Sequence, residues 1–562
     1  MTIRKYSSLF ILLPPMLFIL LAYVCYPNLQ ILIQSFFSDR GFTADYYREF
    51  FSIRHPSSLQ ALWGSVYVSL LTVFFSGIVG VSLAYVFTHY IFPGRKLFSL
   101  IAVLPVVMPP LVGVLAFLFL FGESGILPRL LQALLQLDSA PFSLRGVAAI
   151  IVVHTYSMYV YFYLFASAAF GEMDVAILEA AQNLGATRWL ILRKIIFPLL
   201  TPGLGGASLL VFMTSMASFS APFIFAGGFR ILSLEIYNSK LNGELAMAIT
   251  QSVILTGISI LFLILLRFYS RGKTYVGSSK GVRLQPKPVS RGWATWLMGI
   301  AGIGMVVFLI MPHLTVVLIS FVKNGTWTAQ TLPPEYTFEN YISLFEDPRV
   351  IEPISNSVKM ATLATTANVA FGVIAAYLLI RKRFFGKKLI EVLTMLPWAI
   401  PGTVIAIGLI VAFNRPTLFS AGKILVGTFW ILPLAYFIRN LPVVFRSTYS
   451  ALEQFDPSLE ESSRNLGASW WFSFRKVMLP LIAPGVVSGA LLAYVLAIGE
   501  FVASILLYNY DNRPISVEIN AQLRIFNLGS AAAYSVFLFI LIGLVLALSH
   551  RLLGERGTRV TM

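Results

Sequence analysis

Two stretches of this sequence, Glu179–Gly203 (EAAQNLGATRWLILRKIIFPLLTPG) and Glu461–Gly485 (ESSRNLGASWWFSFRKVMLPLIAPG), are copies of each other. They share Asn-Leu-Gly-Ala, Arg-Lys, Pro-Leu and Pro-Gly at matching positions. Each is too rich in charge to lie in lipid, yet each is flanked by long apolar runs. They are candidate docking elements, and they divide the chain into two comparable halves.

The composition is typical of a protein that crosses a membrane many times. Of 562 residues, 57% are hydrophobic and 12% are charged, with a mean hydropathy of +0.81. The net charge is +17, but the basic residues cluster in short connections between apolar runs, so it does not indicate a nucleic-acid partner. A single cysteine, Cys25, excludes an internal disulfide and a thiolate metal cluster.

Twelve apolar runs are long enough to span a membrane core of roughly 30 Å. They lie near residues 9–33, 61–90, 97–121, 144–170, 199–226, 245–267, 294–322, 354–381, 388–413, 421–446, 481–508 and 529–553. The first run is too long for a secretory signal and no small-residue cleavage site follows it, so we expect it to be a membrane helix. The chain is therefore predicted to be an all-α polytopic membrane protein.

The charges of the loops predict one orientation. The connection Arg267–Trp293 carries seven Lys or Arg residues and no acid, whereas Lys323–Pro353 carries five acids against two bases. Because cytoplasmic loops are enriched in Lys and Arg, the first connection is predicted to be cytoplasmic and the second external. Both termini and both copied stretches then lie in the cytoplasm.

The two halves are parallel repeats of six spans each. Leu104-Pro105 matches Leu396-Pro397 at an offset of 292 positions, whereas Gly185 matches Gly467 at an offset of 282. The first half therefore has about ten extra residues, which we place in the external stretch 122–145, where 130–137 is a candidate surface helix. We predict halves at 1–267 and 294–562, a basic linker at 268–293 and a central pathway between the halves.

Each copied stretch belongs to a predicted helix-turn-helix unit, at residues 172–198 and 453–480, which we call the first and second cassette. Gly185 and Gly467 stand where a left-handed residue would end the first helix. Thr187 and Ser469 are ready N-caps for the second helix, which Pro198 and Pro480 are expected to stop before the next span. An amphipathic helix lying on the membrane is the alternative, but it would not need the same turn chemistry twice.

The cassettes resemble the EAA motif of ABC importer permeases. In that family the motif forms a coupling helix that docks onto the ATP-hydrolysing subunit, and the second cassette departs from it by having Ser462-Ser463 in place of the Ala pair. The resemblance covers nearly the whole chain and implies two fused permease halves of the type I fold. The coupling residues carried over from the motif are Glu179, Ala180, Ala181, Gly185, Pro198, Glu461, Gly467 and Pro480.

The same resemblance implies the partners and the location. We expect two copies of a cytoplasmic ABC ATPase subunit that hold ATP-Mg, a periplasmic or extracellular solute-binding protein, and contact with membrane lipid. The chain itself would hold no cofactor and would lie in the bacterial inner membrane.

Enzyme motifs are not found in the sequence. Gly272-Lys273-Thr274 is the only partial phosphate-binding loop, but Arg267 replaces its first glycine and an apolar helix precedes it. Metalloprotease and serine-hydrolase motifs and paired carboxylates are missing as well. We therefore expect a permease rather than an enzyme; the competing class, an ion-driven secondary transporter, would leave the two cassettes unexplained.

Polar residues within the predicted spans are candidates for the pathway. Glu500 lies in the eleventh run, and its counterpart in the first half is Ser218. Glu500 is expected either to line the pathway or to pair with a base such as Arg439. His154 is interpreted as a histidine that packs between helices. Prolines expected to break helices beside the pathway stand at matching places, namely Pro105, Pro109, Pro110, Pro397 and Pro401.

The substrate is suggested by resemblance alone. The stretches 499–504 (GEFVAS) and 513–519 (RPISVEI), together with the fused architecture, look most like the ferric iron permeases. Fused relatives for thiamine, 2-aminoethylphosphonate or polyamines share the cassettes and remain alternatives.

Overall fold

The computed structural model describes residues 2–38, 41–54, 56–270, 285–289, 292–327 and 330–557, and these are almost entirely helical. Most of the predicted linker 268–293 lies outside the described residues. The helices of the first half are α1 (Thr2–Ile19), α2 (Tyr26–Gln34), α3 (Asp45–Phe50), α4 (Ser57–His89), α5 (Arg95–Ile101), α6 (Pro110–Phe121), α7 (Ile126–Leu134), α8 (Gly146–Gly171), α9 (Val175–Asn183), α10 (Arg188–Ile191), α11 (Phe197–Met216), α12 (Ser220–Phe225), α13 (Leu232–Leu241) and α14 (Leu245–Ser270).

The second half repeats this order, but its segment 414–430 is shorter than the equivalent segment 122–145 and contains no α-helix. Its helices are α15 (Gly292–Ser320), α16 (Glu339–Glu346), α17 (Pro348–Arg381), α18 (Lys387–Met395), α19 (Gly402–Phe413), α20 (Ile431–Glu453), α21 (Pro457–Asn465), α22 (Trp470–Ser473), α23 (Leu479–Ile498), α24 (Ser504–Leu507), α25 (Ile515–Arg524) and α26 (Leu528–Gly557). In the described ranges, four two-residue strands form two pairs: β1 (Phe37–Ser38) with β2 (Gly41–Phe42), antiparallel, and β3 (Tyr90–Ile91) with β4 (Lys287–Pro288), parallel.

The number of spans differs from the twelve predicted. Among the described residues, ten helices are long and apolar enough to cross a membrane, or up to eleven when a strongly bent pair is counted as one span. The predicted span 421–446 is the one that is missing from the observed spans. Its first ten residues are a loop and a short turn, and α20, which follows, carries Arg439 and Arg446 and so is less apolar than the other spans.

Prolines break the third and ninth predicted spans, as expected. The run 388–413 becomes α18, a short 3₁₀ turn at Leu396–Trp398 and α19, with a bend of 109° between them. The equivalent run in the first half becomes α5, a 3₁₀ turn at Leu104–Val107 and α6. A proline donates no backbone hydrogen bond and cannot continue a helix without strain, so the matched prolines break both repeats at the same place.

The first helix of each half packs on the other half. Tyr23 and Tyr26, in the α1–α2 region, lie against Phe413 and Phe419 of the second half, at ring distances of 6.0 and 4.9 Å. In return, Tyr156 of α8 donates a hydrogen bond to the carbonyl of Leu309 in α15 at 2.8 Å. The division of the chain into halves is therefore not a division in space, and this exchange ties the two bundles together.

A matched pair of glycines lies at a helix contact in each half. Gly80 of α4 faces the backbone of α8 so closely that a Cβ atom there would overlap the carbonyl oxygen of Tyr159. Its counterpart, Gly372 of α17, faces Val444 and Phe445 of α20. Small residues let membrane helices approach until their backbones touch, and dispersion contacts along the seam then hold them together.

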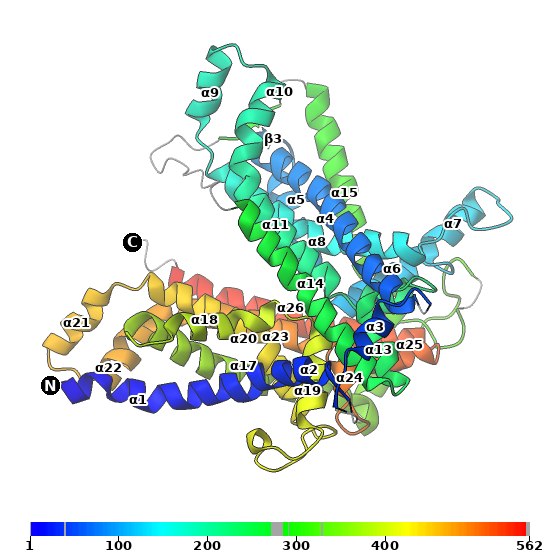
Figure 1. Cartoon of the computed structure of the whole chain (residues 1–562). Coiled ribbons are helices and arrows are strands. Elements are labelled where there is room, and N and C mark those ends of the chain that lie inside the picture. The colour runs from blue at the N-terminus through cyan, green and yellow to red at the C-terminus, as the bar shows by residue number, and fades with distance from the viewer. Residues whose placement is uncertain are drawn as a thin grey trace.

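The helices form two arms that diverge from a common base (Figure 1). One arm contains α4, α8, α11 and α14 and has α9 at its free end, whereas the other contains α17, α20 and α23 and has α21 at its free end. The short helices α13, α24 and α25 lie where the arms join. The two cassettes are thus held at the far ends of the molecule, on the side toward which the arms separate.

Candidate functional site

The helix of each cassette begins at an aspartate. The carboxylate of Asp174 accepts a hydrogen bond from the backbone N–H of Ala176 at 3.0 Å, and Asp456 accepts one from Ser458 at 2.9 Å. These N-caps satisfy backbone donors that the first turn leaves open. The helices α9 and α21 therefore begin inside the predicted units 172–198 and 453–480, four residues before Glu179 and Glu461. Asp456 followed by Pro457 was a sequence signal for this start.

The turn that ends each helix is the one predicted. Gly185 and Gly467 have φ angles of +80° and +89°, which side chains of L-residues rarely adopt. In the first cassette the N–H of Gly185 donates to the carbonyl of Gln182, and the N–H of Ala186 donates to that of Ala181. The second cassette has the equivalent two bonds, from Gly467 and Ala468. This pair of bonds is a Schellman motif, which satisfies two carbonyls at the helix end.

The second helix of each cassette starts as predicted but is not stopped by its proline. Thr187 and Ser469 cap it, since each hydroxyl accepts a hydrogen bond from a backbone N–H at 3.2–3.3 Å. The helix then runs through π-helical turns at Leu192–Ile196 and Phe474–Met478 into α11 and α23. The expectation that Pro198 and Pro480 end it was wrong.

The π turns explain how the helix passes these prolines. The N–H of Phe197 donates to Leu192 and that of Leu479 to Phe474, five residues back instead of four. A proline ring would crowd the carbonyl four residues before it, and the wider turn relieves that crowding. A third π turn, Leu20–Cys25, lies two residues before Pro27 in the same way. Each cassette is therefore continuous with a membrane helix.

The cassette helices carry apolar side chains that no other part of the described chain covers. No residue of α9 or α21 is buried. Leu184 and Leu466, at equivalent positions beside the turn glycines, are 88% and 89% exposed. Further matched pairs of exposed residues are Ile177 with Leu459, Trp189 with Trp471 and Leu190 with Phe472. Sequence analysis missed these residues, although their recurrence in both cassettes was a visible signal.

The carried-over motif residues share this surface. Glu179, Ala180 and Glu461 are exposed, Ala181 and Pro198 are half-buried, and Pro480 is exposed at the start of α23. The second cassette is also attached to the helix bundle, because Trp470 Nε1 donates a hydrogen bond to the hydroxyl of Tyr377 in α17 at 2.7 Å.

Glu500 lies where α23 ends, at a break in the membrane helix. It is 6% exposed, and its Oε1 lies 3.2 Å from Nη1 of Arg439 on α20. The same oxygen accepts the backbone N–H of Ala503 at 2.8 Å. The predicted pair with Arg439 is therefore formed. Arg439 packs directly on Gly402, where a Cβ atom would overlap its guanidinium, so the pair also fixes the start of α19.

Ser218, the counterpart of Glu500, takes part in a hydrogen-bond network with His154. His154 Nε2 lies 2.8 Å from Ser218 Oγ, and His154 Nδ1 lies 3.2 Å from Ser215 Oγ and 3.4 Å from Thr72 Oγ1. His154 is 3% exposed. These partners agree with its interpretation as a packing histidine, since they join α4, α8 and α11 within one arm.

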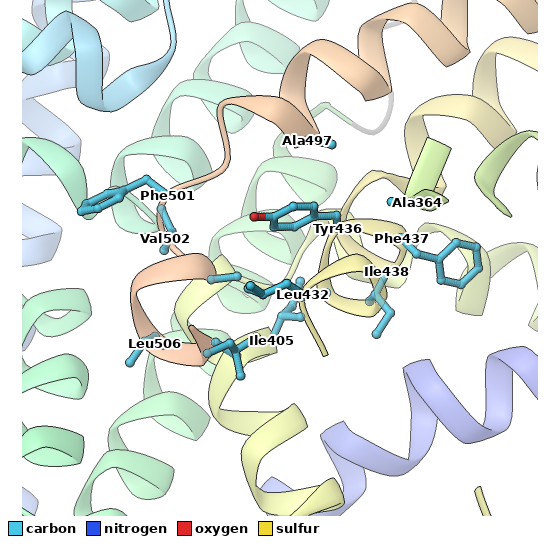
Figure 2. Packing of buried hydrophobic residues seen from close by; sticks show 14 of the residues in the cluster. Ala364, Ile405, Leu432, Tyr436, Phe437, Ile438, Ala497, Phe501, Val502 and Leu506 are labelled. Atoms are coloured by element: carbon cyan, nitrogen blue, oxygen red, sulfur yellow. The ribbon is translucent and has the colours of Figure 1, made fainter. Parts of the chain in front are cut away.

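The second half replaces this network with apolar packing. The positions equivalent to Thr72, His154 and Ser215 are Ala364, Tyr436 and Ala497. Figure 2 shows the ring of Tyr436 near Ala497, whereas Phe501 points away from it. The hydroxyl of Tyr436 is bonded to Ser504 Oγ at 2.7 Å. The two halves thus share a backbone plan but stabilise the break after α11 and α23 by different chemistry.

Aromatic side chains from both halves meet beside these breaks. Phe219 and Phe223 of the first half lie 5.1 Å apart, and each ring is 5.9 Å from that of Phe501. Phe219 and Phe501 are buried. Within the described ranges, no group of three or more His, Cys, Asp or Glu side chains is placed to hold a metal ion.

The sequence matches a family model twice. Residues 76–275 and 368–558 each match the family described as "binding-protein-dependent transport system inner membrane component". The two matches begin 292 positions apart, which is the offset of the repeat at that point.

Similar proteins are transport permeases. A probable ABC transporter permease protein of Sinorhizobium fredii is 30% identical over 82% of this chain and 81% of its own length. The ferric transport system permease protein FbpB of Actinobacillus pleuropneumoniae is 27% identical over 95% of this chain and 76% of its own length. The sulfate transport system permease protein CysT of Escherichia coli is 28% identical over 40% of this chain and 84% of its own length.

Proposed function

The chain belongs to the family of binding-protein-dependent transport system inner membrane components, the permeases of ABC importers, and we propose that it couples to two cytoplasmic ATPase subunits through α9 and α21. ATP-Mg would be held by those subunits. A solute-binding protein outside the membrane would deliver the substrate, and both chain termini would lie in the cytoplasm, as the basic loops favour.

The observation that carries this proposal is the matched exposure of Leu184 and Leu466. Two leucines almost fully open to water, each beside a rigid glycine turn, are unfavourable unless a partner covers them. Burying one leucine side chain contributes about 1.5–3 kcal/mol. An ATPase subunit with an apolar groove would gain this from each cassette, and two equivalent cassettes call for two equivalent subunits.

A movement of either cassette would be transmitted to the membrane by a continuous helix, α10 with α11 or α22 with α23. Because the π turns let α10 and α22 run into α11 and α23, a displacement of α9 or α21 would move the helices that end just before Ser218 and Glu500. Those breaks carry the Phe219 and Phe501 rings. Closing the two cassettes together would shift both breaks at once, and a pathway at the junction of the arms would open and close with them.

Coupling is tested by the double variant Leu184→Asp with Leu466→Asp. We expect it to fold and to lose its ATPase subunits in co-purification from the membrane. The matched control Leu130→Asp with Leu134→Asp changes leucines of the external helix α7, of which Leu134 is 68% exposed, and should leave the complex intact. Retention of the ATPase by the cassette variant would overturn the coupling proposal, as would retention by Gly185→Pro with Gly467→Pro.

Iron(III) is the substrate that we propose. The full-length similarity to ferric transport permeases and the 499–504 and 513–519 stretches support it. The shorter similarity to a sulfate permease supports an oxyanion as the second candidate. Fused relatives that transport thiamine, 2-aminoethylphosphonate or polyamines share the cassettes, so these substrates remain alternatives.

The substrate is tested on the partner binding protein. A ligand that binds only the folded state raises the melting temperature in proportion to the logarithm of its concentration over Kd. We expect iron(III) to raise it. A rise with sulfate, a phosphonate or an organic cation, and none with iron(III), would overturn the assignment.

A further inference from the structure

A groove of about 500 Å³ lies where α4 passes the loop that leads into α13. The two helices lie beside each other at the base of the first arm (Figure 1). Gly64 of α4 allows this close approach, because a Cβ atom there would overlap the carbonyl oxygen of Arg230. The lining residues used below are Trp63, Gly64, Tyr67, Gly228 and Arg230.

The groove lies on an apolar, uncovered face of α4. The large side chains of this face are 50–66% exposed, namely Trp63, Tyr67, Leu70, Phe74 and Ile78. Hydroxyl side chains lie on the opposite, buried side of the helix, namely Ser65, Ser69, Thr72 and Ser76. Because polar side chains point into the bundle and large apolar ones point out, this face is suited to lipid rather than to water.

The depth of the groove follows from the length of α4. The helix has 33 residues, whereas a membrane core of roughly 30 Å needs about 20. Counted back from His89, beyond which the basic Arg95 follows, such a core ends near Leu70, or a few residues earlier if the helix is tilted. Trp63 and Tyr67 then lie at the opposite boundary, where these residue types are enriched. In the orientation that the loop charges favour, this is the external boundary.

Arg230 brings a positive charge to this boundary. Its Nη1 donates a hydrogen bond to Oε1 of Glu235 at 3.1 Å, and its side chain is 45% exposed. The guanidinium makes no other hydrogen bond within the described ranges, so most of its five N–H donors stay open. Glu235 does not line the groove. A phosphate in the groove would therefore meet the guanidinium, which can bind two of its oxygens at once.

The second half fills the equivalent space. Asn356 stands at the position of Gly64, and Ser355 stands at that of Trp63, both at the offset of 292. Nδ2 of Asn356 donates a hydrogen bond to the carbonyl of Arg513 at 3.3 Å, in the segment equivalent to the loop before α13. The tryptophan and the open space are therefore features of the first half.

We propose that the groove binds a phospholipid of the external leaflet, with its phosphate on Arg230 and an acyl chain along Leu70 and Phe74. The inference goes beyond the proposed function, because it depends on neither the ATPase nor the transported solute. The lipid would lie against the loop 226–231, which joins α12 to α13. Since α12 carries Phe223, whose ring is 5.9 Å from that of Phe501, a bound lipid would restrain a segment next to the aromatic contact between the halves.

The test follows the fluorescence of Trp63, which lines the groove and is 66% exposed. The full-length chain is placed in nanodiscs of a galactolipid, which has no phosphate, with a minor fraction of brominated phosphatidylethanolamine. Bromine quenches nearby tryptophans, and the difference from Trp63→Phe isolates the signal of Trp63. The probe is zwitterionic, so the net charge of +17 does not attract it generally. We expect it to be enriched about tenfold at Trp63, the scale of one charge-assisted hydrogen bond.

Two variants test the groove, and a third serves as the control. Arg230→Gln should remove the enrichment because it removes the charge. Gly228→Leu should remove it by filling the groove, since no atom lies within 4 Å of a Cβ atom at this position. The matched control is Gly304→Leu on α15, where the space around a Cβ atom is equally open but the groove is not lined. It should bind the probe like the unaltered chain.

Thermal unfolding in nanodiscs without phospholipid checks that each variant folds. Gly228→Leu leaves the Arg230–Glu235 pair intact, so it carries the test if Arg230→Gln does not fold. Quenching of Trp63 in proportion to the mole fraction of the probe would overturn the inference. So would equal enrichment in a folded Arg230→Gln or Gly228→Leu variant, or a loss of enrichment in Gly304→Leu as large as that in Gly228→Leu.

Discussion

Phe219 and Phe501 occupy the same position in the two repeats, 282 residues apart, and their rings touch at 5.9 Å. Residues related by a twofold axis contact each other only when they lie beside that axis. The pair therefore marks the pseudo-twofold axis of the molecule, at the point where α11 and α23 have just ended. Both side chains are buried, with exposed fractions of 0% and 2%, so the axis is closed there.

Truncation of this pair should open the axis. Phe219→Ala with Phe501→Ala removes both rings, and we expect a solute leak that does not depend on ATP. The leak is measured as uptake into proteoliposomes that contain the permease without its ATPase. Each Phe→Ala change in a packed site costs about 3–5 kcal/mol, so folding is checked by thermal unfolding in the same samples.

Phe445→Ala serves as the control, because Phe445 is equally buried but packs beside Tyr449 within the second arm. It should lose similar stability without a leak. Equal leakage from both variants would contradict a closing role for Phe219 and Phe501.

The ion pair of Arg439 and Glu500 predicts a double-mutant cycle. Arg439→Gln leaves a buried carboxylate without its cation, and we expect a loss of about 1–3 kcal/mol, less than for a fully buried pair because Arg439 is 33% exposed. Adding Glu500→Gln removes the unpaired charge and keeps an acceptor for the N–H of Ala503. The double variant should unfold within about 1 kcal/mol of the unaltered chain. Additive losses would show that the pair is not coupled.

Much of this architecture was predictable because local rules act in both copies. A glycine at 185 and again at 467, followed by a hydroxyl residue two positions later, specifies a Schellman turn and a new N-cap without any tertiary contact. The matched prolines 105 and 397 likewise predicted where both repeats bend. A weak sequence signal is more informative when it occurs at equivalent positions in both repeats, because a coincidence is then less probable.

Other features depend on packing that the sequence does not contain. Pro198 has two outcomes, a helix end or a π turn, and the choice follows from α11 continuing into the bundle. Glu500 suggested two roles, and only the position of Arg439 on a neighbouring helix shows which contact forms. The exposure of Leu184 does not follow from its residue type, because leucines occur both in protein cores and on protein surfaces, and only its recurrence as Leu466 pointed to it.

The N-cap of the second cassette, Asp456, gives a prediction about how well α21 is protected from hydrogen exchange. Hydrogen bonds from the backbone N–H of Ser458 hold the pKa of Asp456 below its usual range, so the charged cap is present above the unfolded pKa of about 3.9 and is lost only as pH falls through the folded value. Asp456→Ala should raise deuterium uptake across 457–465 at pH 7. Asp456→Asn, which can still cap, should not, and wild-type protection should be the same at pH 5 and pH 8 after correction for intrinsic exchange. Equal uptake in the Ala and Asn variants would exclude capping as the cause.

Gly80 and Gly372 give the last prediction, because the same substitution should have different effects at equivalent positions. A Cβ atom at Gly80 would overlap the backbone of α8 at Tyr159 and Tyr163, which cannot move without shifting the helix. At Gly372 the nearest atoms are 3.2–3.4 Å from such a Cβ, and the Val444 side chain among them can adjust. We expect Gly80→Ala to cost about 1–3 kcal/mol by overpacking. Gly372→Ala should change stability by less than about 1 kcal/mol, since alanine favours the helix by a similar amount. Thermal unfolding of the two variants in one detergent compares them directly, and equal losses would mean that the two helix seams are equally close.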